Sequence, residues 1–322
     1  MTTVSDIDIV IDDQIRLIGA LLAASPWPDD AQRRRPHGTH AHARAARKHL
    51  TPFRGHPAAI VLQALLDRGI PLESICAAAV NDAPRPDWLP ADWPTLLGDF
   101  GAQAGLAAWW HGAAADWEAS VEQARRVFAD VRLKPFLKPI FGAVSARLTF
   151  MPNLLYPADR ELAVAGGDIL LALIPPPLAW GDSPPWPYDE DPAHTVRVTV
   201  AQFAYLLTNA LLDAHGADVG DAAPFTDMAR GRLGRVYAAA DWPTLFRDLF
   251  VPALTALYLE QAFSAGESRA YVLMERRTHK LESLDTMIAL LRDFGAQQAA
   301  SGFPDFGAFL PEFPAAYRAL AI

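Results

Sequence analysis

Two segments, 161-ELAVAGGDILLALI-174 and 196-VRVTVAQFAYLLTNALLDAHG-216, decide the fold class of this chain. The first has apolar, strand-favouring residues on both sides of Gly166-Gly167, and such a glycine pair is typical of a turn or bulge. The second has apolar residues at helical spacing, which predicts a helix with one buried face. The residues of that expected core stripe are Val196, Val200, Phe203, Leu207 and Ala210.

Helical patterns dominate on both sides of these segments. The stretch 145-SARLTFMPNLLYP-157 reads as a further strand, and Ser5–Val10 alternates polar and apolar residues as a short strand does. Helices are expected at 40–50, 93–131, 196–215, 225–239, 243–263 and 267–300. The pattern predicts an α+β fold, mostly α-helical, with a helical N-terminal region (1–140), a core with a small sheet (141–265), and a C-terminal helix with an aromatic tail (266–322).

The bulk composition argues against several classes of protein. Hydrophobic residues make up 51% of the 322 and charged ones 20%, which is typical of a folded globular chain. The formal net charge of −9 disfavours nucleic acid as a partner, because phosphate binding needs a concentrated positive surface. We find neither a basic, apolar secretion signal nor a run of about 18 apolar residues, so no membrane partner and a cytoplasmic location are expected. The lone cysteine, Cys76, is expected to be a small buried hydrophobe.

The order of elements carries a resemblance to a known family. In zinc peptidases with a His-Glu-x-x-His helix, two histidines at i and i+4 hold the metal and the glutamate polarises a bound water. The chain resembles an uncharacterised bacterial family of predicted zinc metallopeptidases, of the zincin type, whose members carry this helix after an edge strand. The segments that match are 52-PFRGHPAAIVLQALLDRGI-70, 161-ELAVAGGDILLALI-174 and 199-TVAQFAYLLTNALL-212.

The resemblance implies a zinc site that has been lost. Ala201 stands where the first ligand histidine belongs, Gln202 at the catalytic glutamate and Tyr205 at the second histidine. Alanine has no lone pair to offer, glutamine has no ionisable carboxylate, and a phenol is a poor zinc ligand at neutral pH. Glu260 is the nearest candidate for the third ligand that many such enzymes take from a later helix. We therefore expect no metal, no cofactor and no catalytic residues.

Five histidines between His37 and His56 suggest a second possible metal cluster. On a helix, His40 and His42 point to opposite sides, which argues against a shared metal and favours a basic, solvated helix face. The sequence also lacks the nucleophile elbow, the phosphate-binding loop and paired zinc cysteines. Most common chemistries therefore lack their sequence signature.

The expected function is that of a catalytically inactive, metallopeptidase-like protein that binds a peptide or protein partner in the former substrate cleft. The segment Asp168–Ile174 is expected to be the edge strand that accepts the peptide. One alternative is an active hydrolase with a rearranged site built from His194, His215 or His279 with Glu260. A second alternative is a structural or oligomerisation module.

Overall fold

A computed structural model describes residues 5–28, 39–80, 85–177, 183–233 and 237–321. Contacts divide the chain into two compact units: unit 1 holds residues 1–130 and 146–195, and unit 2 holds residues 131–145 and 196–322. This division differs from the three expected regions, because the strands pack with N-terminal helices and the helix that follows them packs mostly with C-terminal ones.

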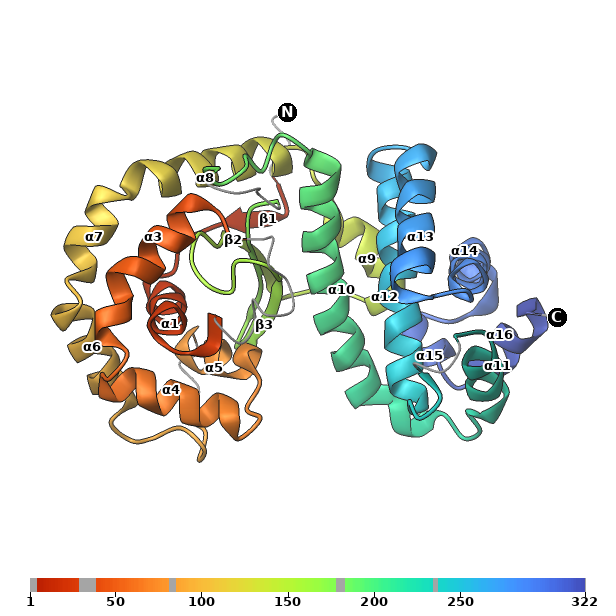
Figure 1. Ribbon diagram of the computed structural model, residues 1–322. Helices are drawn as coiled ribbons and strands as arrows, with labels where there is room; N and C mark the ends of the chain where they lie inside the picture. The colour runs from red at the N-terminus through yellow and green to blue at the C-terminus, as the bar shows by residue number, and fades with distance from the viewer. Residues whose placement is uncertain (1–4, 29–38, 81–84, 178–182, 234–236, 322) are drawn as a thin grey trace. The chain divides into compact units, whose positions relative to one another are not determined.

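In unit 1, helices surround a small mixed sheet. In Figure 1, helices α4, α6, α7 and α8 curve around α1 and α3. The helices of unit 1 are α1 (Asp13–Ala24), α3 (Ala41–Leu50), η1 (Thr51–Phe53), α4 (Pro57–Asp67), α5 (Leu72–Val80), α6 (Trp93–Gln103), α7 (Leu106–Gly112) and α8 (Ala114–Phe128). The single run expected at 93–131 is thus three helices, and Gly105, at φ +61°, separates the first two.

The sheet has four strands in the order β1-β2-β4-β3. Their bounds are β1 (Ile7–Ile9), β2 (Arg147–Pro152), β3 (Leu162–Gly166) and β4 (Ile169–Ile174). The first three in this order run parallel, and β3 pairs antiparallel with β4. The predicted turn at Gly166-Gly167 is confirmed: Gly167 has φ +56° in a two-residue connection, where a hairpin favours glycine.

Both faces of the sheet are covered, as expected of parallel strands with continuous apolar sequences. On one face Phe150 of β2 packs against Phe128 of α8 and against Tyr188, with ring centres 5.0 and 5.5 Å apart. On the other face Leu171 and Leu173 join a core built with α1, α3, α4 and α5. Cys76 lies in this core, where burial raises the pKa of its thiol to about 12.

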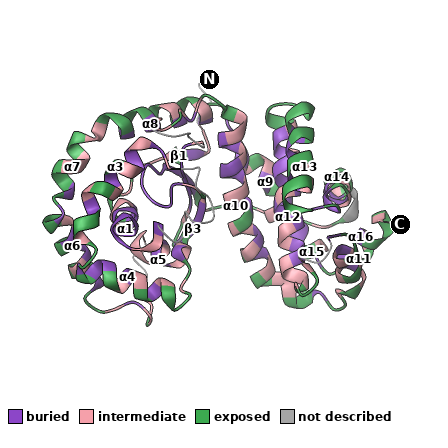
Figure 2. Ribbon diagram, viewed as in Figure 1, coloured by how far each residue is buried: buried purple, intermediate pink, exposed green. Residues whose placement is uncertain are grey.

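In its described residues, unit 2 contains helices and the loops that join them, and no strand. Its elements are α9 (Leu133–Phe141), α10 (Pro192–His215, whose first turn belongs to unit 1), η2 (Gly216–Asp218), α11 (Ala223–Leu233), α12 (Trp242–Ala262), α13 (Ala265–His279), α14 (Leu284–Ser301), α15 (Phe306–Phe309) and α16 (Phe313–Ala321). Helix α12 packs against α13 and α14. In Figure 2 the buried residues of α12 contrast with the exposed face of α13.

The expected single helix at 267–300 is wrong. It divides into α13 and α14 because Lys280 adopts the left-handed conformation, with φ +61°, and so ends α13. The aromatic tail packs onto the rest of unit 2: Phe306, Phe313 and Tyr317 are fully buried, and the Phe246 and Phe313 ring centres lie 4.9 Å apart.

The predicted fold class is confirmed, because a small four-stranded sheet stands among a large majority of helical residues. In the part of the chain that the structure describes, no helix combines the length and the apolar character needed to cross a bilayer.

Candidate functional site

Helix α10 carries the positions that match the peptidase motif. The Asp191 carboxylate accepts a hydrogen bond from the His194 backbone N–H at 2.9 Å, which caps the start of the helix. Val196, Val200 and Phe203 are fully buried, as the expected apolar stripe requires. Leu207 and Ala210, expected on the same stripe, are half-buried and exposed respectively, because they line a pocket instead of the core.

The three degenerate positions lie away from the Phe203 side of the helix. Ala201 is half-buried against the core of unit 2, Gln202 is half-buried, and the Tyr205 side chain is 38% exposed. The Arg247 guanidinium lies over the Tyr205 ring, 5.3 Å from its centre. Tyr205 and Phe203 therefore face different surroundings.

Glu260 has a different partner from the one expected. Its carboxylate forms an ion pair with Arg292 of α14, and in the described part of the chain no hydrogen bond joins it to Tyr205. The resemblance to zinc peptidases also implies that α10 packs across the sheet. That stays a prediction, because most of the helix and the sheet belong to different units.

Two of the three histidines proposed for a rearranged hydrolase pair with carboxylates other than Glu260. His279 Nδ1 lies 2.6 Å from the buried Glu275, and His215 Nδ1 lies 3.5 Å from Asp218. Among the described residues, no three His, Cys, Asp or Glu side chains are placed to hold a metal ion together.

The strand expected at the sheet edge is internal, which corrects the assignment of Asp168–Ile174. Strand β4 pairs with β2 on one side and with β3 on the other, so its backbone groups are already used. The edge strands of the described sheet are β1 and β3, and β3 is the one that adjoins β4.

Two residues of β3 direct their backbone N–H and C=O groups to the outer edge of the sheet. Gly166 and Ile169 flank a two-residue turn and therefore form a hydrogen-bonded pair. Hydrogen-bonded pairs alternate along an antiparallel ladder, so the next one is Val164 with Leu171. The backbone N–H and C=O groups of Ala163 and Ala165 consequently point away from β4. No hydrogen bond to these outward groups occurs in the described part of unit 1.

A buried group of imidazoles in unit 1 corrects the expected solvated helix face. His40 caps α3, its Nδ1 accepting from the Ala43 N–H at 3.3 Å, and His56 caps α4 in the same way. Burial, with smaller contributions from His42 and Arg44, lowers the pKa of His40 to about 3. His37 lies outside the described residues.

His42 is also buried, and its Nδ1 lies 2.9 Å from the Asp116 carboxylate of α8. Burial lowers the pKa of His42, although Asp116 acts in the opposite direction. The Arg16 guanidinium lies between the Trp110 and Trp117 rings, 4.1 and 4.5 Å from their centres. These contacts join α1, α3, α7 and α8 and support the unit.

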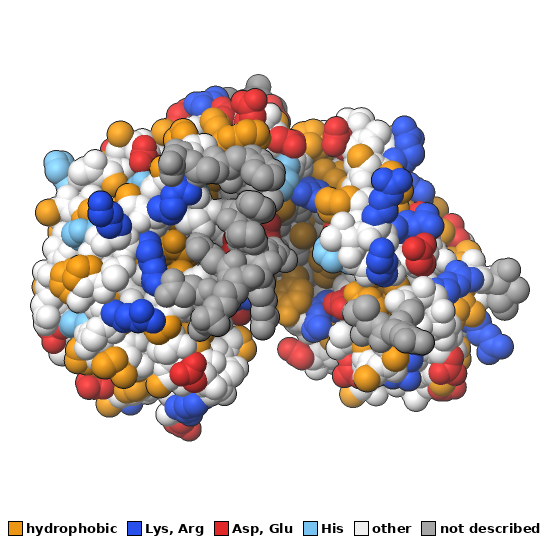
Figure 3. All heavy atoms as spheres, viewed as in Figure 1, with side chains coloured by type: hydrophobic (Ala, Val, Ile, Leu, Met, Phe, Trp, Pro, Cys, Tyr) orange, Lys and Arg blue, Asp and Glu red, His pale blue; other side chains and the backbone are white. Residues whose placement is uncertain are grey.

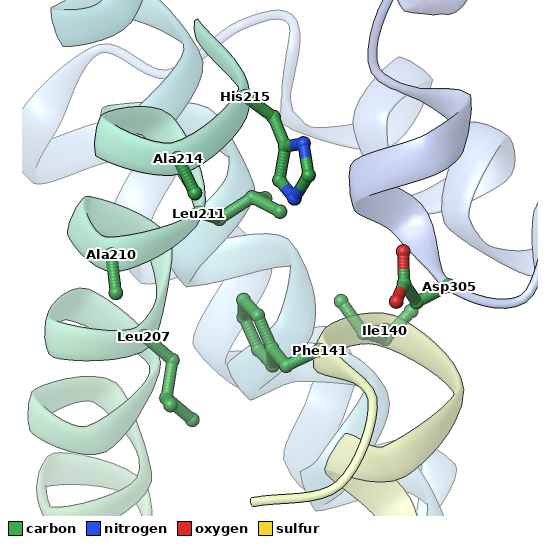
Figure 4. A pocket seen from close by; sticks show the side chains of 8 residues that line it. All are labelled: Ile140, Phe141, Leu207, Ala210, Leu211, Ala214, His215 and Asp305. Atoms are coloured by element: carbon green, nitrogen blue, oxygen red, sulfur yellow. The ribbon is translucent and has the colours of Figure 1, made fainter.

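A pocket of about 200 Å³ opens within unit 2 (Figure 4). Helix α10 forms one wall and contributes Leu207, Leu211 and His215, while α9 contributes Phe141. Asp305, which precedes α15, lies on the side opposite α10. The sequence gives little signal for this pocket, because its polar residues are 90 positions apart.

Comparison with protein-family models, with curated proteins and with solved structures finds no match for this chain.

Proposed function

We propose that this chain is a non-catalytic, metallopeptidase-like protein that binds an extended peptide by strand addition along β3. The observation that carries the proposal is the outer edge of β3, where Ala163 and Ala165 present backbone donors and acceptors without a neighbouring strand. A peptide that pairs with these groups gains main-chain hydrogen bonds, a mode that needs no metal.

The residues of α10 support a binding role over a catalytic one. Zinc-dependent peptide hydrolysis of this type needs imidazole ligands and a general base, and Ala201, Gln202 and Tyr205 supply neither. Tyr205 and Gln202 do offer an aromatic ring and an amide, which are suited to contacts with a protein partner.

The rearranged hydrolase has less support. His215 and His279 pair with Asp218 and Glu275, and Glu260 pairs with Arg292. A dyad that acts on a substrate requires a base and its orienting carboxylate next to a nucleophile or a bound water. Neither of the histidine pairs includes Glu260.

The test blocks the edge of β3 with the smallest possible change. Ala165 is exposed and its N–H points outward, so Ala165→Pro removes one outward donor without removing a hydrogen bond to β4. Ala165→Thr, which keeps the N–H and favours a strand, is the matched control. A library of displayed twelve-residue peptides is selected on the unmodified protein, and the affinities of the selected peptides are then measured for all three proteins.

We expect the selected peptides to bind the unmodified protein and Ala165→Thr alike. Ala165→Pro should bind them about tenfold more weakly, the effect of losing a desolvated hydrogen bond. Amide exchange at Ala163 and Ala165 should slow when peptide is present. Equal affinity for the proline variant, or a library that yields no binder, would refute strand addition at β3.

A further inference from the structure

The pocket in unit 2 combines apolar walls with two polar groups at one end. Leu207, Leu211 and Phe141 line the apolar part. The His215 ring and the Asp305 carboxylate lie at the polar part (Figure 4). A site of this kind takes a ligand with an apolar body and one polar end, and the polar groups select the chemistry of that end.

The backbone of Gly307 lies close to both polar groups, which limits the distance between them. A Cβ atom built on Gly307 would lie 2.9 Å from His215 Nε2 and 3.2 Å from Asp305 Oδ1. Both atoms therefore border the same small volume and lie about 6 Å apart at most. A hydrogen-bond donor with several protons can reach two acceptors that are no more than about 6 Å apart when it lies between them, about 3 Å from each.

The charge of this end favours a cation. Asp305 accepts a hydrogen bond from the Ala308 N–H at 3.1 Å as the cap of α15, and within the described residues it forms no ion pair with a basic side chain. Asp218, beside His215 Nδ1, favours the tautomer that carries its proton there, and this leaves a lone pair on Nε2. A carboxylate and an imidazole lone pair together match an ammonium group.

Figure 3 shows that Lys and Arg side chains gather over α13 in the same unit. One of these cations, Arg276 of α13, pairs with Glu282 and Asp285 and not with Asp305. Among the described residues, no basic side chain forms an ion pair with Asp305, so its charge can attract a cationic ligand.

We propose that this pocket binds a small apolar primary amine, with its ammonium between Asp305 and His215 and its carbon chain against Leu207, Leu211 and Phe141. A cavity of about 200 Å³ suits such a body, since a buried cavity of about 150 Å³ holds benzene. The amine is either a free alkylamine or the amino terminus of a peptide that begins with an apolar residue.

The test uses n-hexylamine as the probe, with hexanol and hexanoate as neutral and anionic comparators of equal chain length. Binding is followed by protein NMR titration at low salt. We expect a Kd on the order of 1 mM for hexylamine, about tenfold weaker binding of hexanol and none of hexanoate. Equal affinity for all three would show that the site has no preference for an amine and would overturn the proposal.

Two variants alter separate parts of the site. Asp305→Asn removes the charge and keeps a good cap for α15, so it should weaken hexylamine binding about fivefold. Ala210→Phe fills the apolar part from an exposed position on α10 and should abolish binding. Asp213→Asn is the matched control, because it removes an exposed carboxylate of α10 that does not line the pocket.

If Asp213→Asn weakened binding as much as Asp305→Asn does, the effect would be one of net charge, and the proposed site would be wrong. The tripeptide Leu-Gly-Gly and its N-acetylated form separate the two sources of the amine. Binding that is lost on acetylation assigns the pocket to a peptide amino terminus, and hexylamine binding alone assigns it to free amines. These variants lie in unit 2, so they test a different site from Ala165→Pro in unit 1.

Discussion

Acid should destabilise unit 1 through His40, and the size of the effect follows from its burial. In the folded chain burial holds the pKa of His40 at about 3, whereas in the unfolded chain it is 6.5. The unfolded chain therefore takes up a proton below pH 6.5 that the folded chain does not, and the free energy of unfolding falls as the pH falls. Each pH unit below 6.5 costs about 1.4 kcal/mol, which amounts to about 2 kcal/mol at pH 5.

The variant His40→Asn isolates this effect. Asparagine is a favoured helix cap and keeps an acceptor for the Ala43 N–H, but it cannot take up a proton. Urea unfolding is followed at pH 7 and pH 5 by tryptophan fluorescence, which reports mainly on unit 1, because every tryptophan except Trp242 lies there.

We expect the unmodified protein to lose about 2 kcal/mol more than His40→Asn between these pH values. The exposed His111, replaced by asparagine, is the matched control for the loss of one histidine in the same unit. The same acid sensitivity in the unmodified protein and in His40→Asn would show that His40 is not held neutral by burial.

Three further predictions follow from the packing and the chemistry of the chain. Gly19→Ala should lower the free energy of unfolding in urea by about 1–3 kcal/mol, because its Cβ would lie 3.0 Å from Leu155 Cβ and 3.2 Å from the Tyr156 carbonyl. Gly98→Ala, with open space around it, should raise that free energy by about 0.5–1 kcal/mol. A rise at both positions would contradict this packing. Cys76 should resist iodoacetamide at pH 8 until urea unfolds unit 1, since burial holds its pKa at about 12, and rapid labelling of the native protein would count against that burial. After dialysis against a weak chelator the protein should hold far less than one zinc per chain by metal analysis, because Ala201 and Tyr205 replace the two imidazoles; about one zinc per chain would rule out the lost-site interpretation.

Local patterns in the sequence predict the elements well. The glycine pair at 166–167 gives the hairpin, and the apolar spacing from Val196 gives α10, because each depends on residues near one another in the chain. The single helix expected at 267–300 is wrong because that prediction rests on local apolar periodicity alone. Apolar periodicity resumes after Lys280, and nothing in that periodicity requires the left-handed turn that ends α13 there.

The edge of the sheet illustrates what local patterns leave open. A hairpin fixes that β3 and β4 pair, but it does not say which of the two pairs with a third strand. The composition does contain a signal: 169-ILLALI-174 is a continuous apolar run, typical of a strand with neighbours on both sides, whereas β3 is rich in small residues. This difference in composition favours β3 over β4 as the edge strand.

Two pairs of polar residues depend on tertiary packing. His40 and His42 follow a basic stretch that is typical of a solvated surface, yet both are buried, and Trp109, Trp117 and Asp116 from later helices contact His42. Asp305 and His215 meet only because Gly307 has no side chain, since a Cβ there would lie 2.8 Å from the His215 ring. A single methyl group at position 307 would thus displace the imidazole or close the pocket, and no property of the segment around Gly307 indicates this, because the contact is made with a helix 90 residues earlier in the chain.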